Sequence, residues 1–207
     1  VIDNLANSLG MKSVVATGRK SSIAILTRLP IKSWNCFDPP YIGRPLLEAT
    51  VETPSGHSFT LFGLHLQCHF FKHNEKQRVR ELTSYLNYIS EHNCDEHVIL
   101  GDFNAVAEGD SPLVYRMPLK EKLMLQWENQ HLYHDAISVV QEKGYVDCFR
   151  LVNPTASGFT LPVHAPNIRL DYIFASITLA NNVQKCRVHN TESTLAASDH
   201  FPLYAAF

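Results

Sequence analysis

The amino-acid sequence predicts an α+β fold in which two mostly antiparallel β-sheets pack face to face, with helices on the outside. Three observations predict it: short apolar runs separated by turn signals recur along the chain, long helical patterns are few, and strands and helices do not alternate regularly. With 207 residues and 45% hydrophobic composition, the chain can bury a sizeable core. We therefore expect a single domain over 1–207.

The first third of the chain indicates one short helix followed by strands. The apolar positions Ile2, Leu5 and Leu9 follow helical spacing, and Gly10 ends the pattern. Apolar runs that precede turn signals then predict strands at 14–16, 23–26, 47–52 and 59–66. The last run is apolar on both faces, as expected for a strand buried between a second sheet and a covering helix.

The clearest helix is predicted at 74–92. Asn74 is expected to cap it, with Gln77 in the capping-box position. One apolar stripe follows at steps of three and four residues, made of Val79, Leu82, Leu86 and Ile89.

Later elements are shorter. A buried strand is predicted at 97–100, an irregular excursion at 105–130, and a second helix at 133–143 that stops at Gly144. Late strands are predicted at 169–175, 184–189 and 202–207.

Composition excludes some classes of function. The formal net charge is -2, so no global basic field gathers nucleic acid. No apolar run is long enough to cross a bilayer and no signal peptide is visible. The cysteines are odd in number and form no C-x-x-C pair: Cys36, Cys68, Cys94, Cys148 and Cys186. We expect free thiols in a reducing, cytoplasmic compartment.

The end of the chain carries the strongest chemical signal. Asp199 and His200 stand side by side before an apolar run, which places a carboxylate suited to a hard metal beside an imidazole suited to activating water. The alternative is an Asp-His dipeptide with no catalytic role.

Two further acidic residues, Asp102 and Asp171, support the catalytic interpretation. Asp102 follows a buried strand and a glycine, and Asn104 stands two residues later. Asp102 is expected to meet a metal or the nucleophilic water, and the Asn104 amide to donate to a phosphate oxygen. The alternative is an Asx-type turn in which both side chains satisfy the backbone.

Asp171 lies inside a predicted strand, between Leu170 and Tyr172, where an unpaired charge is costly. Its partner is either an arginine, Arg169 or Arg187, or His200. In the second case the carboxylate fixes the tautomer of the imidazole and raises its basicity.

Histidines and basic residues around 65–80 leave alternatives open. His65 ends a strand and can face a site; with His69 and His73 it recurs every four residues, which on a helix would indicate zinc. We favour strand and loop positions over a shared helical face. The basic cluster of Lys72, Lys76, Arg78 and Arg80 is either a solvated helix face or a rim for substrate phosphate.

Four motifs in this order resemble the signature of the endonuclease/exonuclease/phosphatase superfamily: Gly-Leu-His-Leu at 63–66, Gly-Asp-Phe-Asn-Ala at 101–105, Arg-Leu-Asp-Tyr-Ile-Phe at 169–174 and Ser-Asp-His-Phe-Pro-Leu at 198–203. The resemblance implies a four-layer αββα sandwich and hydrolysis of phosphoesters with Mg²⁺ or Mn²⁺. It implies Asp199 as a metal ligand and His200 as the base, oriented by Asp171. Asp102 and Asn104 then position water and phosphate, and His65 contacts the scissile phosphate.

The front of the chain departs from the resemblance. The family opens with strands that carry an Asn and a metal-binding Glu, and neither motif is present, so we expect an N-terminally incomplete domain. Its exposed sheet edge predicts self-association. The alternative function is a non-catalytic remnant or binding domain that lost its metal-ligand Glu. Near-neutral charge favours a small or lipid-like phosphoester over nucleic acid as substrate.

Overall fold

The centre of the molecule is a six-stranded sheet. The computed structural model describes residues 1–92, 95–129 and 131–207. The strands run in the order β3-β4-β5-β6-β8-β7, and β5 pairs in parallel with β6, whereas the other neighbours are antiparallel. Their bounds are β3 Ile31–Phe37, β4 Leu46–Glu52, β5 Ser58–His65, β6 His97–Asp102, β8 Asp171–Ala175 and β7 Val146–Asp147.

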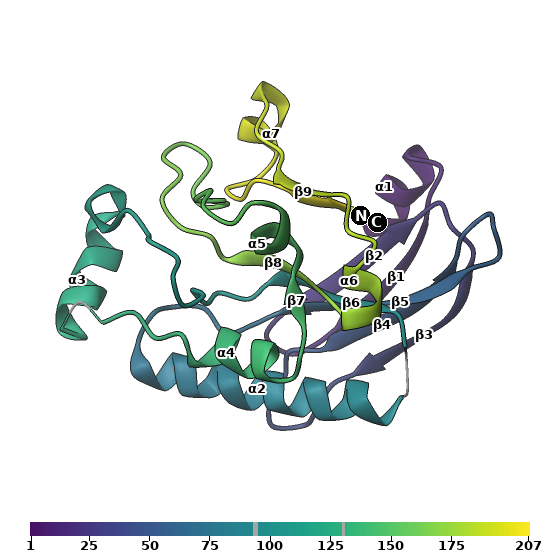
Figure 1. The fold of residues 1–207 in the computed structure, drawn as a ribbon, viewed down its shortest axis with the longest axis horizontal. Helices are drawn as coiled ribbons and strands as arrows, with labels where there is room; N and C mark the ends of the chain where they lie inside the picture. The colour runs from purple at the N-terminus through teal and green to yellow at the C-terminus, as the bar shows by residue number, and fades with distance from the viewer. Residues whose placement is uncertain (93–94, 130) are drawn as a thin grey trace.

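One face of this sheet is covered by helices. The helices α2 (Lys72–Glu91) and α4 (Asp135–Glu142) pack along it (Figure 1). Leu82 and Leu86 of α2 share an apolar cluster with Phe62 and Ile99 of the sheet. The predicted stripe on this helix therefore faces the core.

The other face carries a second β layer in two separate hairpins. The hairpin of β1 (Lys12–Thr17) and β2 (Ser22–Thr27) packs on β4 and β5. The hairpin of β9 (Lys185–Val188) and β10 (Leu203–Ala206) packs on β8 (Figure 1). A central sheet with flanking sheets and outer helices agrees with the predicted αββα sandwich.

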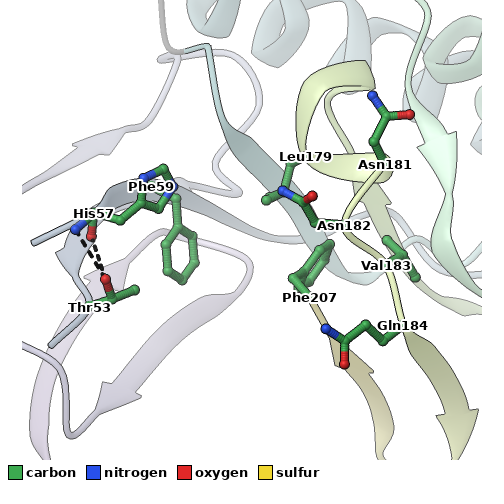
Figure 2. A pocket seen from close by; sticks show the side chains of 9 residues that line it. All are labelled: Thr53, His57, Phe59, Leu179, Asn181, Asn182, Val183, Gln184 and Phe207. Carbon is green, nitrogen blue, oxygen red and sulfur yellow. Dashed lines mark hydrogen bonds between the residues drawn. The ribbon is translucent and has the colours of Figure 1, made fainter. Parts of the chain in front are cut away.

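A hollow of about 640 Å³ lies between the start of β5 and the end of β10. Figure 2 shows Phe59 and His57 on one side, and Phe207 with Val183 on the other. The two hairpins therefore leave part of the sheet between them uncovered at this end.

Short helices make up the rest. They are α1 Ile2–Ser8, the 3₁₀ helix η1 Val114–Arg116, α3 Leu119–Trp127, α5 Cys148–Val152, α6 Ile177–Ala180 and α7 Glu192–Ala197. Within the described ranges, no helix has the length and apolar character needed to cross a membrane.

The start of α2 differs from the prediction. The helix begins at Lys72 after Phe71, no side chain caps it, and Asn74 is buried within the first turn. The Phe71 carbonyl accepts from the N–H groups of Asn74 and Glu75, so the chain turns two residues earlier than expected. The capping box was therefore wrong, because Gln77 donates forward along the helix to Glu81.

Several further elements were not predicted, among them β3 and α3. β3 forms over 31–37, and α3 lies within the stretch predicted as irregular. In β3 five of the seven residues are exposed, so the strand lacks the apolar alternation that indicates a half-buried strand.

Candidate active site

Three of the predicted site residues lie in a row across adjacent strands. His65 ends β5 and is in register with Asp102, which ends β6, and Asp102 is in register with Asp171, which begins β8. In-register residues on neighbouring strands point to the same side of a sheet. The row therefore brings one imidazole and two carboxylates together at one edge.

Gly101 permits this close packing. Its φ is 138°, and a Cβ at this position would lie 2.0 Å from the Leu64 carbonyl oxygen. Only glycine fits there, which gives the Gly-Asp sequence of the motif a structural reason.

His200 lies over the Asp171 end of the row. Its Nδ1 lies 2.8 Å from Oδ2 of Asp171. A carboxylate can only accept, so Nδ1 carries the proton and Nε2 is left for a substrate or water. This hydrogen bond and the charges of Asp171, Asp102 and Asp199 together raise the pKa of His200 to about 8, against the lowering effect of burial.

The arginine alternatives for Asp171 were wrong. Arg169 pairs instead with Asp110 and Asp147, at 2.9 and 2.6 Å. Arg187 lies over the ring of Tyr204. The expected contact between Asp171 and His200 is confirmed.

Asp102 and Asn104 form an Asx-type turn. Oδ1 of Asp102 accepts the backbone N–H of Asn104 at 2.8 Å, and Oδ2 accepts from Nδ2 of Asn104 at 3.0 Å. The same Nδ2 donates to the Leu66 carbonyl. The Asn104 amide nitrogen is thus bound to the protein in this state, as the structural alternative predicted.

Burial and the charge of Asp171 raise the pKa of Asp102 to about 6, although the hydrogen bonds from Asn104 oppose the shift. Two carboxylates held side by side repel each other. This edge of the sheet is therefore electrostatically suited to attracting a cation or a proton.

His65 completes the row. Its Nε2 lies 3.5 Å from Oδ2 of Asp102. Burial lowers its pKa, as do the charges of Arg44 and His200. His65 is therefore neutral at pH 7 and can donate a hydrogen bond without carrying charge.

The histidines at 65, 69 and 73 do not share a helical face. His65 ends β5, His69 lies in a loop with a φ of 74°, and His73 lies in the first turn of α2. Across the ranges that the structure describes, no group of three His, Cys, Asp or Glu side chains is placed to hold a metal ion.

Asp199 is exposed and lines a hollow of about 230 Å³ with Phe70 and Leu161. Asp171 and His200 line a different hollow, of about 330 Å³. Mg²⁺ is commonly held by one or two carboxylates together with water and substrate phosphate oxygens. The hard oxygen donors of Asp199 fit that role in type.

The basic cluster on α2 is only partly a solvated face. Lys72, Lys76 and Arg80 are exposed, but Arg78 is buried and binds Glu75 and the carbonyls of Gln67 and His69. Arg78 therefore fixes the loop that follows His65.

A buried ion cluster behind the site was not foreseen. Arg169 joins Asp110 to Asp147 and lies 4.3 Å from the ring centroid of Tyr172. The Tyr172 hydroxyl in turn bonds the backbone of Ala105 and Ala107. The cluster ties the loop after Asp102 to the strand of Asp171. The sequence feature that could have indicated this cluster was Arg169, which stands next to an apolar strand.

The family model described as the Endonuclease/Exonuclease/phosphatase family matches residues 4–200. The chain belongs to this family, and the resemblance found in its four motifs is confirmed.

Several solved structures share the fold. An AP endonuclease from Archaeoglobus fulgidus aligns with a TM-score of 0.74 at 20% identity, over 98% of this chain and 81% of that one. The 3' phosphatase NExo from Neisseria, bound to a product DNA hairpin, gives 0.67 at 20% identity over 99% and 82%. A humanized D. rerio TDP2 gives 0.63 at 16% identity over 99% and 79%. No curated protein matches the sequence significantly.

Proposed function

We propose that this chain hydrolyses phosphoesters with a water molecule activated by His200. Membership of the family supports a phosphoesterase in general. The observation that carries the finer proposal is the 2.8 Å contact between Asp171 and His200, beside the row of Asp102 and His65.

Each residue of the site has a role in this proposal. Nε2 of His200 takes the proton of the attacking water, while Asp171 holds the ring in the required tautomer and stabilises the imidazolium that forms. Asp102, held in place by Asn104, orients the water, and the neutral His65 donates to a phosphoryl oxygen.

Asp199 is the residue that would hold Mg²⁺ or Mn²⁺. When bound, the cation supplies neutralisation of the charge that develops on the phosphoryl oxygens. Because the pKa of His200 is about 8 in the absence of a cation, the basic form of the ring increases as the pH rises through that value.

The preference for a small or lipid-like substrate over nucleic acid receives no support from the comparisons. Two of the similar structures are described as an AP endonuclease and as a 3' phosphatase bound to a DNA hairpin. A net charge of -2 describes the whole chain and not the groove around the site. Both classes of phosphoester are therefore substrates to test.

A non-catalytic binding domain is the second candidate. It is favoured by the lack, among the described residues, of three side chains grouped to hold a metal. A phosphoesterase hydrolyses its substrate, whereas a binding domain does not, so a hydrolysis assay distinguishes the two candidates.

The test is hydrolysis of bis(p-nitrophenyl) phosphate with Mg²⁺ or Mn²⁺ present. His200→Gln should reduce kcat by about 10² to 10⁴, as expected for loss of a general base. Asp171→Asn should reduce it at least about tenfold, because an amide no longer enforces the tautomer. His189→Gln, at an exposed histidine, is the matched control. Unchanged turnover in His200→Gln would refute the role of His200, and a folded wild-type chain without turnover would support the binding domain.

A further inference from the structure

A third buried arginine, Arg44, lies two residues before β4 and is only 8% exposed. Its Nη2 donates to Oε1 of Gln67 at 3.0 Å. Its Nε is buried and makes no hydrogen bond within the part of the chain that the structure describes. The nearest carboxylate oxygen, Oε1 of Glu81, lies 3.7 Å from Nε, which is too far for a hydrogen bond.

Glu81 does not fully compensate this charge. Its two oxygens already accept from the backbone of Gln67 and the amide of Gln77, both at 3.0 Å. Burial raises the pKa of Glu81. Arg78 shows the contrast: its guanidinium contacts Glu75 at 2.7 Å and donates to two backbone carbonyls. Arg44 is thus a buried cation whose Nε–H donor is unused within the described ranges. Burying such a charge is unfavourable unless an anion pairs with it.

Arg44 lies at the same sheet edge as the site. Leu47 of β4 is in register with Gly63 of β5, so the start of β4 adjoins the end of β5, where His65 lies. The charge of Arg44 contributes, after burial, to the low pKa of His65. The Gln67 that binds Arg44 directly follows Leu66, whose carbonyl accepts from Asn104.

The spacing of strands separates Arg44 from His200. Neighbouring strands lie about 4.8 Å apart, so β4 is roughly 10 Å from β6 and roughly 15 Å from β8. His200 is held by Asp171 at the start of β8. In the strand order, His65 of β5 therefore lies between Arg44 and the Asp171 that holds His200.

The turn between β1 and β2 adds positive charge beside Arg44. The backbone N–H of Lys20 donates to the carbonyl of Gly43 at 2.8 Å, and the Arg19 guanidinium donates to the Pro40 carbonyl. Both side chains are exposed. The charge of Lys20 also acts on Glu81, the carboxylate that faces Arg44.

We propose that Arg44, Gln67 and Lys20 form a subsite for a second phosphate group of the substrate, next to the phosphate that is hydrolysed. The subsite rests on the proposed function for its catalytic meaning, but phosphate binding can be measured without turnover. It selects substrates with two neighbouring phosphates, either a nucleic-acid strand or a small molecule with two phosphate groups.

The first experiment measures binding of inorganic pyrophosphate by calorimetry, without divalent cation. Arg44→Gln should weaken binding roughly tenfold or more, and Arg44→Lys should weaken it less because it keeps the charge but loses the planar donors. Arg80→Gln, which removes one exposed arginine from α2, is the matched control and should bind as the wild type does. Thermal unfolding of each variant reports whether it is folded, and Arg44→Lys carries the test if Arg44→Gln is not.

The second experiment compares kcat/KM for bis(p-nitrophenyl) phosphate, a thymidine tetranucleotide and 2,3-bisphosphoglycerate. Arg44→Gln should lower kcat/KM for substrates with a second phosphate roughly tenfold more than for the diester with one, mainly through KM. The substrate with the larger loss identifies the source of the second phosphate. For the tetranucleotide, the slope of log KM against log salt should fall by about 0.7, the value for one lost phosphate contact on a single strand.

The outcomes separate the subsite from the catalytic proposal. Pyrophosphate binding that depends on Arg44, in a chain that hydrolyses nothing, supports the subsite and refutes the catalytic function. Turnover that depends on His200, with equal losses for all three substrates in folded Arg44 variants, overturns the subsite and leaves the catalytic function standing.

Discussion

Nδ1 of His200 donates a hydrogen bond to Asp171 over 2.8 Å, although the two residues are 29 positions apart in the sequence. The contact joins the loop before β10 to the first residue of β8. It controls the protonation of the ring, and its effect can be measured without any assay of activity.

The Asp171–His200 contact should make the stability of the fold depend on pH. The pKa of His200 is about 8 in the folded chain against an ordinary 6.5, so its stabilising effect is complete below 6.5 and is lost as the pH rises through 8. We expect urea unfolding without divalent cations to show about 1–2 kcal/mol less stability at pH 8.5 than at pH 6.5 from this group. Asp171→Asn should flatten the profile and His189→Gln should not.

Other shifted groups of the site lie outside that window. The pKa of Asp102 is raised to about 6, so its ionisation costs stability as the pH rises from about 4 to 6 and adds no slope above. The pKa of His65 is lowered, so its effect falls below pH 6.5. A profile of Asp171→Asn as steep as that of the wild type between pH 6.5 and 8.5 would contradict the assignment.

Asp102 is expected to trade stability for activity. Holding it ionised beside Asp171, in a buried position, is unfavourable by about 3 kcal/mol for a pKa raised from 3.8 to about 6. Asp102→Asn removes this charge but offers a single acceptor oxygen to the two donors of Asn104, so we expect a net gain of about 1 kcal/mol at pH 7.5. Turnover should fall at the same time.

The pH again supplies the control for this substitution. Below about pH 4 the carboxyl group is protonated in the folded and unfolded chain, so the gain in Asp102→Asn should vanish there. Greater stability at pH 3.5 as well as at 7.5 would show that charge repulsion is not its origin.

The sequence predicted which side chains meet in the candidate site because they lie at strand ends within short motifs. Asp102, Asp171 and His200 each follow or precede an apolar run, and strand ends meet at one edge of a sheet. The contact of Asp171 with His200 followed from the cost of a charge between Leu170 and Tyr172. The strands β5, β6 and β8 and the helix α2 were predicted from the spacing of their apolar residues.

What escaped prediction depends on long-range contacts. Arg44 binds Gln67, 23 positions away, and Arg169 binds Asp110, 59 positions away, and no local pattern reports such pairs. The start of α2 was set by the turn at Phe71 and not by a polar cap. β3 escaped because it lies at the edge of its sheet, where side chains are exposed and apolar alternation is lost.

The buried ion cluster behind the site should contribute strongly to stability. Arg169→Met leaves Asp147 without its guanidinium partner, whereas Asp110 keeps Arg150 at 2.7 Å, and breaking a buried pair from one side costs about 3–5 kcal/mol. Arg187→Met, at an exposed arginine over Tyr204, should change the free energy of unfolding by less than about 0.5 kcal/mol. Urea unfolding at pH 7 measures both, and equal effects would show that the cluster is not fully desolvated.

The last prediction concerns the open edges of the second β layer. The six-stranded sheet ends in β3, where a register shift at Ile31/Ser33 and Lys32 disturb the edge, and in β7, which has two residues. Such features protect edges from pairing with other chains. The two hairpins lack them, because neither β2 nor β10 contains a charged residue, a proline or a register shift.

We therefore expect copies of this chain to associate through β2 and β10, whose outer N–H and C=O groups pair with no further strand in the described part of the chain. The hollow between β5 and β10, lined by Phe59 and Phe207, gives an incoming strand an apolar surface to cover (Figure 2). Tyr204→Lys puts a charge on the exposed side of β10 and should shift the equilibrium toward monomer in sedimentation equilibrium. Ser33→Lys adds the same charge to an exposed position of β3 and should leave it unchanged. A wild-type chain that stays monomeric at every concentration would show that these edges are protected by other means.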